Sequence, residues 1–428
     1  MSISVVVPIH NTPVSVLRQA LDCLVVQNFN DYEIICVDDS SDNIDTLNLL
    51  KQYEKDYAEK IKVIYLRKNI GAANSRNVGL DNVKGDYCIF LDSDDVFDKD
   101  LLEMSYNQIL KEKADVCLFG YEMFNDGNGK NTTMDIHIMD FDVKSIQGRE
   151  DYLVLIPASG WNRLCRTQFL RDNDIRFQSL STDNDMFFSL MTLLCTKNVT
   201  NIQGKALISY RYNTPYQISN NMNPLNLVKA IAKVKSTSKK RAVFDDYNRK
   251  IDFYTILTGI LELQKCKCDQ NAKEFYEIYK EYLVNNVKMQ NRFLDNRINL
   301  YIEIWMKEEF ETRWFDKIGN YEGQLEENSE ALLCVVNHKK KILWGRGKRA
   351  DAFLKWSKRH NIKIDGVCDE KNRDIGKYDS YGNLIVYTQD VLRGDSAIIA
   401  SNHMIYQYLE QKAINMDKVV DLESFCPL

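Results

Sequence analysis

The sequence predicts an α/β protein with more than one domain, and two observations support this. The first 120 residues alternate short, almost wholly apolar runs with longer polar or amphipathic stretches. Apolar strands separated by helices are typical of a parallel sheet covered on both faces. The chain also has 428 residues, more than one ordinary domain needs. The alternation stops after residue 220 and restarts near residue 340.

The elements are expected in the following order. In the first part, strands are predicted at 4–9, 33–37, 62–66, 87–91 and 116–119, with helices at 17–26, 44–60 and within 71–82. The polar, glycine-containing residues 125–150 predict a hairpin or loop. Leucine, tyrosine, lysine and glutamate at helical spacing over 222–330 predict several helices. Further strands are expected at 341–344, 362–368, 384–387, 397–400 and 419–420. The predicted domains are therefore 1–220, a helical region over 221–335, and a small α/β domain over 336–428.

Composition narrows the function classes. The net charge of −5 argues against general nucleic-acid binding. The eleven cysteines are scattered, which predicts neither a disulfide framework nor a zinc site and fits a reducing compartment. A strand starting near Ile3 leaves no room for a signal peptide, and no apolar run reaches the length of a membrane span. A cytoplasmic protein is expected.

Polar residues gather where the predicted strands end. They are His10 and Asn11, Asp38 and Asp39, Arg67 and Asn69, and Asp92 and Asp94. Ligands of parallel α/β sheets bind beyond the carboxyl ends of the strands. These four clusters therefore predict one ligand site along a single edge of the sheet.

The last of these clusters, Asp92-Ser93-Asp94-Asp95, follows an apolar strand directly. Charges beside a buried strand are costly unless a cation or ligand meets them. Two carboxylates in Asp-x-Asp can share Mg²⁺ or Mn²⁺, whose coordination is completed by phosphate oxygens and water. The alternative is an acidic turn that caps the helix expected after residues 98–100.

Five motifs in order resemble the family-2 glycosyltransferases of GT-A fold. They are the opening strand and loop 5–11, the first helix 19–27, the segment 34–42, the helix start 69–79, and the metal motif 90–95. The resemblance covers the first 220 residues and implies transfer of a sugar from a nucleoside diphosphate, with UDP favoured, to an acceptor hydroxyl. A metal would stabilise the leaving diphosphate.

The resemblance also implies residue roles. Asp94 would bind Mn²⁺ or Mg²⁺, and Asp92, with its neighbour Ser93, would face the ribose or the waters of the metal. Asp39, rather than Asp38, would hydrogen-bond the base. Pro8 and Asn11 would shape the nucleotide pocket, and Arg76 would approach the diphosphate or the donor sugar. As alternatives, Asp38 or Asp42 caps the next helix and Arg76 is a surface charge.

Inversion at the anomeric carbon needs a base that takes the proton of the acceptor hydroxyl. Matched on Phe188, the segment 181–188 puts Asp185 at the position of the family's base, with Asp183 as its rival. Asn184 departs from the family, where glutamate is common. The alternative for Asp185 is the N-cap of a helix starting near Met186.

Two later segments resemble the family more loosely. Residues 161–166 resemble the floor of the acceptor site, with Arg163 at a position where lysine is usual. Trp161 is expected either to stack on a donor or acceptor sugar or to pack in the core. Arg211, within a late motif, is expected to reach the diphosphate.

The C-terminal half adds two hypotheses. Lysines over 229–240 among apolar residues predict either peripheral contact with the inner face of an anionic membrane or a solvated helix face. Gly345, Gly347 and Ala350 fit G-x-G-x-x-A between a strand and a helix, the dinucleotide fingerprint in its context. This small domain resembles the Rossmann-like domain of some bacterial sugar acetyltransferases. A nucleotide-sugar or regulatory ligand is expected at Gly345, Gly347 and Arg349, or else a structural or oligomerising role.

The resulting hypothesis is an inverting, metal-dependent glycosyltransferase that builds a bacterial capsular or surface polysaccharide on a glycan or lipid-linked glycan acceptor. One alternative is a regulatory protein that binds nucleotide sugars without transferring them. Another is a nucleotidyltransferase, which would leave the segments around Asp185 and Trp161 unexplained. Mutation of Asp94 and Asp185 separates these alternatives.

Overall fold

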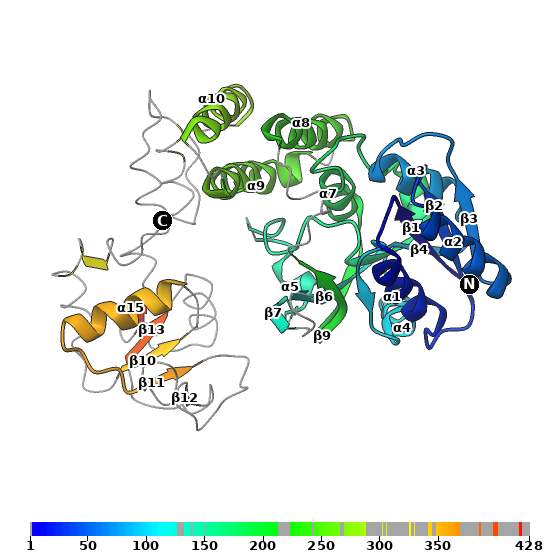
Figure 1. Ribbon diagram of the computed structural model, residues 1–428. Coiled ribbons are helices and arrows are strands. Elements are labelled where there is room, and N and C mark those ends of the chain that lie inside the picture. The colour runs from blue at the N-terminus through cyan, green and yellow to red at the C-terminus, as the bar shows by residue number, and fades with distance from the viewer. Residues whose placement is uncertain are drawn as a thin grey trace. The chain divides into compact units, whose positions relative to one another are not determined.

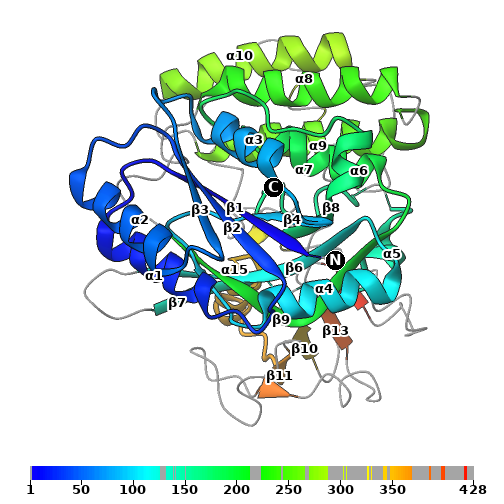
Figure 2. The same cartoon turned by 90° about the vertical axis from the view of Figure 1, so that its right-hand side faces the viewer.

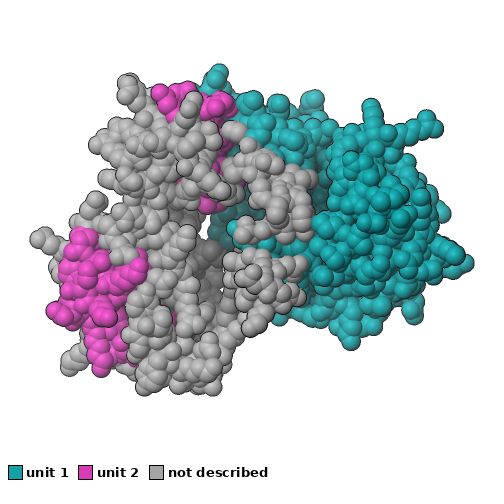
Figure 3. Space-filling model, viewed as in Figure 1, with its two compact units in different colours: residues 1–258, 281–288 teal, residues 259–280, 289–428 magenta. Residues whose placement is uncertain are grey.

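The computed structural model describes residues 2–125, 132–137, 139, 141–149, 151–212, 223–241, 244–265, 269–287, 302, 305, 325–326, 329, 341–344, 348–368, 385–386, 397–400 and 419–421. The chain forms two compact units (Figure 3). Unit 1 comprises Met1–Thr258 with Glu281–Lys288, and unit 2 comprises Gly259–Lys280 with Met289–Leu428. The predicted boundaries at residues 220 and 335 stay a prediction.

Unit 1 is built on a large sheet whose first four strands are parallel. They are β1 (Ile3–Ile9), β2 (Tyr32–Asp38), β3 (Ile61–Tyr65) and β4 (Tyr87–Phe90), in the order β3-β2-β1-β4. Every side chain of β1 is buried, because helices cover both faces of the sheet. This confirms the predicted order of strands and helices, and it brings the ends of β1, β2 and β4 to one edge.

Beyond β4 the sheet is mixed, which corrects the expectation of a wholly parallel sheet. The short strand β8 (Arg163–Arg166) lies antiparallel between β4 and β6 (Val116–Asn125). Beyond β6 the sheet continues with β9 (Val199–Arg211), which is parallel to β6, and ends with β5 (Val96–Phe97), which is antiparallel to β9. The hairpin expected over 125–150 is formed by β6 and β7 (Thr132–His137). An antiparallel strand needs no crossover connection to its neighbours, so the short β8 can pair with both β4 and β6.

The two faces of the sheet carry different helices (Figures 1 and 2). Side chains of α1 (Val14–Val25), α2 (Ile44–Asp56) and α4 (Leu101–Glu112) share one core with Val5 and Val7 of β1. On the opposite face, α3 (Ala72–Asn82) approaches β1 closely. A Cβ on Gly79 would lie 2.2 Å from Cγ1 of Val6, so a glycine is needed for this packing.

Helix α7 (Met186–Cys195) lies on the same face as α3. Its Phe188 packs edge-on against Phe90 of β4 and stacks on Phe177, with ring centroids 5.2 and 4.2 Å apart. The short helices α5 (Val143–Ile146) and α6 (Thr167–Asp172) complete this part of the unit. This aromatic packing holds the start of α7 near the carboxyl end of β4.

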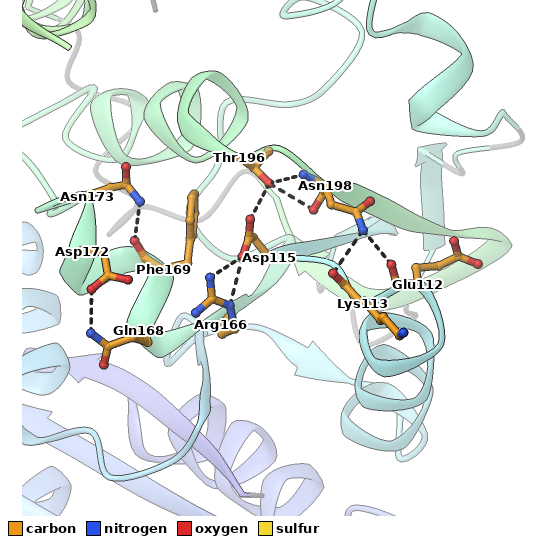
Figure 4. A network of polar contacts seen from close by, with 10 residues as sticks. All are labelled: Glu112, Lys113, Asp115, Arg166, Gln168, Phe169, Asp172, Asn173, Thr196 and Asn198. Carbon is orange, nitrogen blue, oxygen red and sulfur yellow. Dashed lines mark hydrogen bonds and ion pairs between the residues drawn. The ribbon is translucent and has the colours of Figure 1, made fainter.

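A network of polar contacts links β8 and the start of β9 to the end of α4 (Figure 4). Oδ1 of Asp115 accepts hydrogen bonds from Nε and Nη2 of Arg166, at 3.0 and 2.6 Å, and Oδ2 accepts one from Thr196. The side chain of Asn198 donates to two main-chain carbonyls at the end of α4. Since Arg166 pairs with Tyr87 at the amino end of β4, the network lies at the opposite end of β4 from Asp92.

A helical region follows, as predicted, with α8 (Pro224–Lys240), α9 (Phe244–Lys265) and α10 (Asp269–Asn286). Helix α8 packs along α7, where Ser238 contacts Met191 and Arg241 contacts Cys195. Nζ of Lys235 is buried and lies 2.6 Å from Oδ1 of Asp252. Lys235 therefore belongs to the interior and not to a basic surface, whereas Lys229, Lys233, Lys239 and Lys240 are exposed.

Unit 2 contains a second sheet of five parallel strands. Strand β10 (Lys341–Trp344) is central. On one side lie β11 (Gly366–Cys368) and β12 (Ile385–Val386), and on the other lie β13 (Ala397–Ala400) and β14 (Val419–Asp421). Helix α15 (Lys348–Arg359) packs on it through a small core that includes Phe353 and Trp356.

Candidate functional site

The predicted metal motif forms a turn directly after β4. Asp92 and Asp94 are half-buried, and Asp95 is buried. The hydroxyls of Ser93 and Thr12 lie 2.7 Å apart and join the turn to the loop after β1. The carboxylates therefore occupy a turn that is fixed to its neighbours.

Arg211, at the end of β9, stabilises this turn through hydrogen bonds. Its main-chain N–H donates to Oδ1 of Asp95 at 2.9 Å, and its Nε donates to the main-chain oxygen of Asp94 at 2.7 Å. Nη2 donates to Oε1 of Gln19 on α1 at 2.8 Å. The structure thus places Arg211 as a buried support of the metal motif, and its predicted reach to the diphosphate stays a prediction.

Electrostatics make the motif receptive to positive charge. Burial and the neighbouring charge of Asp92 raise the pKa of Asp94 to about 6. Burial, followed by the charges of Asp94 and Asp92, also raises the pKa of Asp95. Raised pKa values in a carboxylate cluster show that the ionised forms repel one another and lose hydration. A bound cation would relieve both effects.

Arg76, on α3, connects the metal motif with the segment that precedes α7. Its Nη2 lies 2.5 Å from Oδ1 of Asp92, and its Nη1 donates to Oδ1 of Asn184 at 3.2 Å. The guanidinium also lies over the ring of Phe177, 5.2 Å from its centroid. With a residue exposure of 8%, Arg76 is no surface charge. The alternative of a solvated Arg76 is therefore wrong.

Asp185 immediately precedes α7, but its side chain does not cap that helix. Instead its Oδ2 accepts a hydrogen bond of 3.2 Å from the main-chain N–H of Gly160. Burial raises the pKa of Asp185, and the charge of Arg76 works against that increase. A half-buried carboxylate with a raised pKa suits a general base.

Asp183, the rival base, has a different environment. Its backbone is left-handed, with φ +54°, and its Oδ2 accepts a hydrogen bond of 3.1 Å from the hydroxyl of Thr182. Asn226 of α8 holds this loop by donating to the hydroxyls of Ser181 and Thr182. Asn184, which stands where glutamate is common in the family, accepts a hydrogen bond from Arg76 through its amide oxygen.

The residues expected around the nucleotide lie at the ends of β1 and β2. Both oxygens of the buried Asp39 accept main-chain hydrogen bonds, from Ile70 at 2.7 Å and Gly71 at 2.8 Å. Asp39 therefore fixes the start of α3, a role that the sequence analysis missed. Pro8 is buried within β1 beside Val37.

Asn11 organises the neighbouring loop. Its side-chain oxygen accepts hydrogen bonds from the N–H groups of Asp42 and Asn43, at 3.0 and 3.1 Å, and its backbone has φ +50°. The N-cap of α2 is Asn43, which accepts from Asp45 and Thr46. Neither Asp38 nor Asp42 is that cap, so this alternative is wrong for both.

Residues 161–165 are buried, whereas Arg166 is half-buried and bonds Asp115 at the far end of β4. Trp161 stacks on Tyr210 with ring centroids 5.5 Å apart and meets Tyr121 edge-on at 4.8 Å. Trp161 is 8% exposed and belongs to the core of unit 1, which favours the packing alternative. Arg163 is fully buried.

The predicted ligand turn of the C-terminal domain falls on Gly345 and Gly347, which lie outside the described residues. Arg349 lies on α15, and its side chain is likewise outside them. Among the helices of the described residues, none is both long enough and apolar enough to cross a membrane.

The N-terminal part of the chain is similar to a known protein family. Residues 4–173 match the family Glycosyl transferase family 2. The matched residues include β2, β3, β4 and all of β1 except Ile3, together with the predicted metal motif and Arg76.

Two similar proteins are both named as enzymes that glycosylate poly(ribitol-phosphate). The poly(ribitol-phosphate) beta-glucosyltransferase of Bacillus spizizenii is 30% identical over 210 residues, which are 47% of this chain and 31% of that protein. The poly(ribitol-phosphate) beta-N-acetylglucosaminyltransferase TarP of Staphylococcus aureus is 30% identical over 195 residues, 44% of this chain and 54% of that protein. The chain thus spans only about a third to a half of the length of these relatives.

The fold is also that of a solved glycosyltransferase. The structure of S. aureus TarS residues 1–349 in complex with UDP-GlcNAc superposes with a TM-score of 0.54, at 18% identity, over 85% of this chain and 93% of that one. The predicted GT-A fold is confirmed by this match together with the mixed α/β sheet of unit 1.

A divalent metal is implied by the resemblance, and the residues fit it in part. Asp94 offers a half-buried carboxylate of raised pKa. Asp92 is engaged by Arg76, and within the described residues no group of three His, Cys, Asp or Glu side chains could hold a metal ion. Mg²⁺ usually takes one or two carboxylates and completes its shell with phosphate and water. The chemistry of the motif therefore fits a metal that arrives with a diphosphate.

Proposed function

We propose that the protein is an inverting, metal-dependent glycosyltransferase that transfers a sugar from a nucleoside diphosphate, preferably UDP, to an acceptor hydroxyl. The observation that carries this proposal is the position of Arg76. One guanidinium bonds Asp92 of the metal motif and Asn184, the neighbour of Asp185. The predicted donor side and the predicted base are thus held in one site.

The residues of the site divide the work. Asp94 would hold the metal, which stabilises the charge that develops on the leaving diphosphate. Arg76 contributes a second positive charge on the same side. Asp185 accepts the proton of the acceptor hydroxyl as that oxygen attacks the anomeric carbon, and the N–H of Gly160 keeps the carboxylate oriented.

We infer that the acceptor belongs to a bacterial surface polymer, in glycan or lipid-linked form. The names of the relatives support this class, since two of them act on poly(ribitol-phosphate). Peripheral membrane contact through the exposed lysines of α8 and homo-oligomer formation remain predictions.

We also infer that unit 2 carries the predicted Rossmann-like domain. With β10 in the centre and β11, β12, β13 and β14 in their observed places, the order of the strands is that of the first five strands of a doubly wound dinucleotide-binding sheet. A nucleotide ligand there stays a prediction.

The function is tested by incubating the protein with a panel of UDP-sugars, Mn²⁺ and a ribitol-phosphate oligomer. Product is detected by mass spectrometry, and its anomeric configuration is determined by NMR. We expect transfer with inversion from at least one donor. Binding of UDP-sugar without transfer or hydrolysis would instead favour the regulatory alternative.

A further inference from the structure

Arg163 on β8 is a fully buried cation near the site, and the proposed mechanism gives it no task. Its exposure is 0%. Nη1 donates to the main-chain oxygen of Ser189 and to the hydroxyl of Thr192, both at 2.7 Å. Nη2 donates to the main-chain oxygen of Pro157 at 3.0 Å and, like Nε, to Oδ1 of Asn162. All five N–H donors of the guanidinium are therefore used.

Three of these four acceptors come from two segments that lie close to Asp185. Pro157 lies in the loop that carries Gly160, whose N–H donates to Oδ2 of Asp185. Ser189 and Thr192 lie in the first two turns of α7, the helix that starts directly after Asp185. One guanidinium thus ties the hydrogen-bond donor of Asp185 and the helix that follows Asp185 to the same strand.

The acceptors bonded to Arg163 are all neutral. Burial lowers the pKa of Arg163 to about 10, and the charge of Asp185 is among the influences that raise it. A buried cation bonded to neutral partners is costly to keep. The cost of burying Arg163 is therefore best explained if its hydrogen bonds and its charge act on a neighbouring residue.

We propose that Arg163 is a positioning residue for Asp185: it clamps the 157–160 loop to the start of α7 and so fixes the carboxylate of the base. This inference rests on the proposed function of Asp185. In this chain a lysine would not keep all of these bonds, because three donors on one nitrogen cannot reach four separate acceptor groups in a planar fork.

The test compares Arg163→Lys and Arg163→Met with a matched control, Arg166→Met. Arg166 lies on the same strand, but it bonds Asp115 at the far end of β4. For Arg163→Lys we expect kcat to fall by about 10- to 100-fold while KM for the donor stays within about twofold, since a small misplacement of a catalytic group has an effect of this size. Arg166→Met should keep the wild-type kcat.

A second readout does not depend on turnover. The pKa of the Asp185 carboxyl is followed by carbon NMR and assigned with Asp185→Asn. The charged groups that act on this carboxyl are Arg76 from α3, Asp92 from the turn after β4, and Arg163 from β8. Loss of a positive charge favours the protonated acid, so Arg163→Met should raise the pKa of Asp185, and Arg166→Met should not.

The outcomes separate this inference from the proposed function. If the wild-type protein transfers no sugar, the proposed function fails, and the NMR titration still tests the clamp. If Arg163→Met is too unstable to study, Thr192→Val removes one acceptor and should lower kcat by a smaller factor at unchanged KM. A wild-type kcat in Arg163→Lys, together with an unchanged pKa of Asp185 in Arg163→Met, would overturn the inference.

Discussion

Arg76 and Asp92 form an ion pair 2.5 Å long between α3 and the turn after β4, with side-chain exposures of 10% and 24%. A second pair of the same length, Arg176 with Asp81, lies at the surface, with exposures of 45% and 55%. Both are arginine–aspartate pairs, but they differ in burial and in the second partner of the arginine, which is Asn184 for Arg76 and Asp174 for Arg176. Substitution of each arginine therefore compares a mostly buried charge cluster with a surface one in the same protein.

We expect Arg76→Met to lower the free energy of unfolding by about 2–3 kcal/mol, because it leaves the half-buried charge of Asp92 without its partner. Arg176→Met should change it by less than about 1 kcal/mol. Urea denaturation measures both. Equal effects of the two substitutions would show that the Arg76 pair is as weak as a surface pair.

The sequence predicts the parallel half of the sheet well, because runs such as 3–9 and 32–38 are mostly apolar and can be recognised from neighbouring residues alone. It does not predict the direction of β8, because a strand of four residues pairs by long-range contacts that no local pattern encodes. The same limit applies to the site. Asp92 and Asp185 were found through motifs, but the bonds of Arg76 and Arg163 join residues that are far apart in the chain.

Asp39 illustrates a second limit. Its type and place at the end of β2 suit both ligand binding and main-chain anchoring, and only the fold shows that Ile70 and Gly71 donate to it. A signal was present in the sequence, because Gly71 lies just before a predicted helix. Its φ of +85° explains the glycine.

Substitution at Gly160 tests the geometry around Asp185. A Cβ there would lie 2.6 Å from Cε1 of Phe177 and 3.5 Å from Cβ of Asp185. Phe177 is stacked on Phe188 and cannot move freely. We expect Gly160→Ala to lower kcat by about 10- to 100-fold and the unfolding free energy by about 1–3 kcal/mol.

The control for this variant is Gly148→Ala, where an added Cβ meets nothing within 4 Å. Its unfolding free energy should stay within about 0.5 kcal/mol of wild type. A fully active Gly160→Ala would contradict the close approach of residue 160 to the base.

Asp185 should reduce the stability of the folded protein at neutral pH. Burial raises its pKa in the folded state, so folding favours the protonated form. The unfavourable contribution of the carboxylate is absent below the unfolded-state pKa and develops as the pH rises through the folded-state pKa. Asp185→Asn should therefore have a higher Tm than wild type at pH 8 and a similar Tm at pH 3.5. Differential scanning fluorimetry measures this, and a lower Tm of the variant at pH 8 would be the contrary result.

Asp39→Asn tests the anchoring of α3. The new amide replaces one oxygen that now accepts a main-chain N–H, so a buried donor loses its partner. We expect the unfolding free energy to fall by about 1–3 kcal/mol without any nucleotide present. Asp38→Asn is the control, because the Asp38 oxygens accept a longer bond, 3.3–3.4 Å, from Ser41. An unchanged stability of Asp39→Asn would leave base recognition as the main role of Asp39.

In the proposed mechanism Asp94 serves the leaving diphosphate and Asp185 serves the acceptor. The most direct test measures transfer and UDP binding for wild type, Asp94→Asn and Asp185→Asn, with Mn²⁺ and the UDP-sugar that wild type uses. We predict that both variants lose transfer by at least about 10²-fold, that Asp94→Asn also loses Mn²⁺-dependent binding of UDP, and that Asp185→Asn binds UDP as wild type does. Transfer at the wild-type rate by Asp185→Asn would show that Asp185 is not the base.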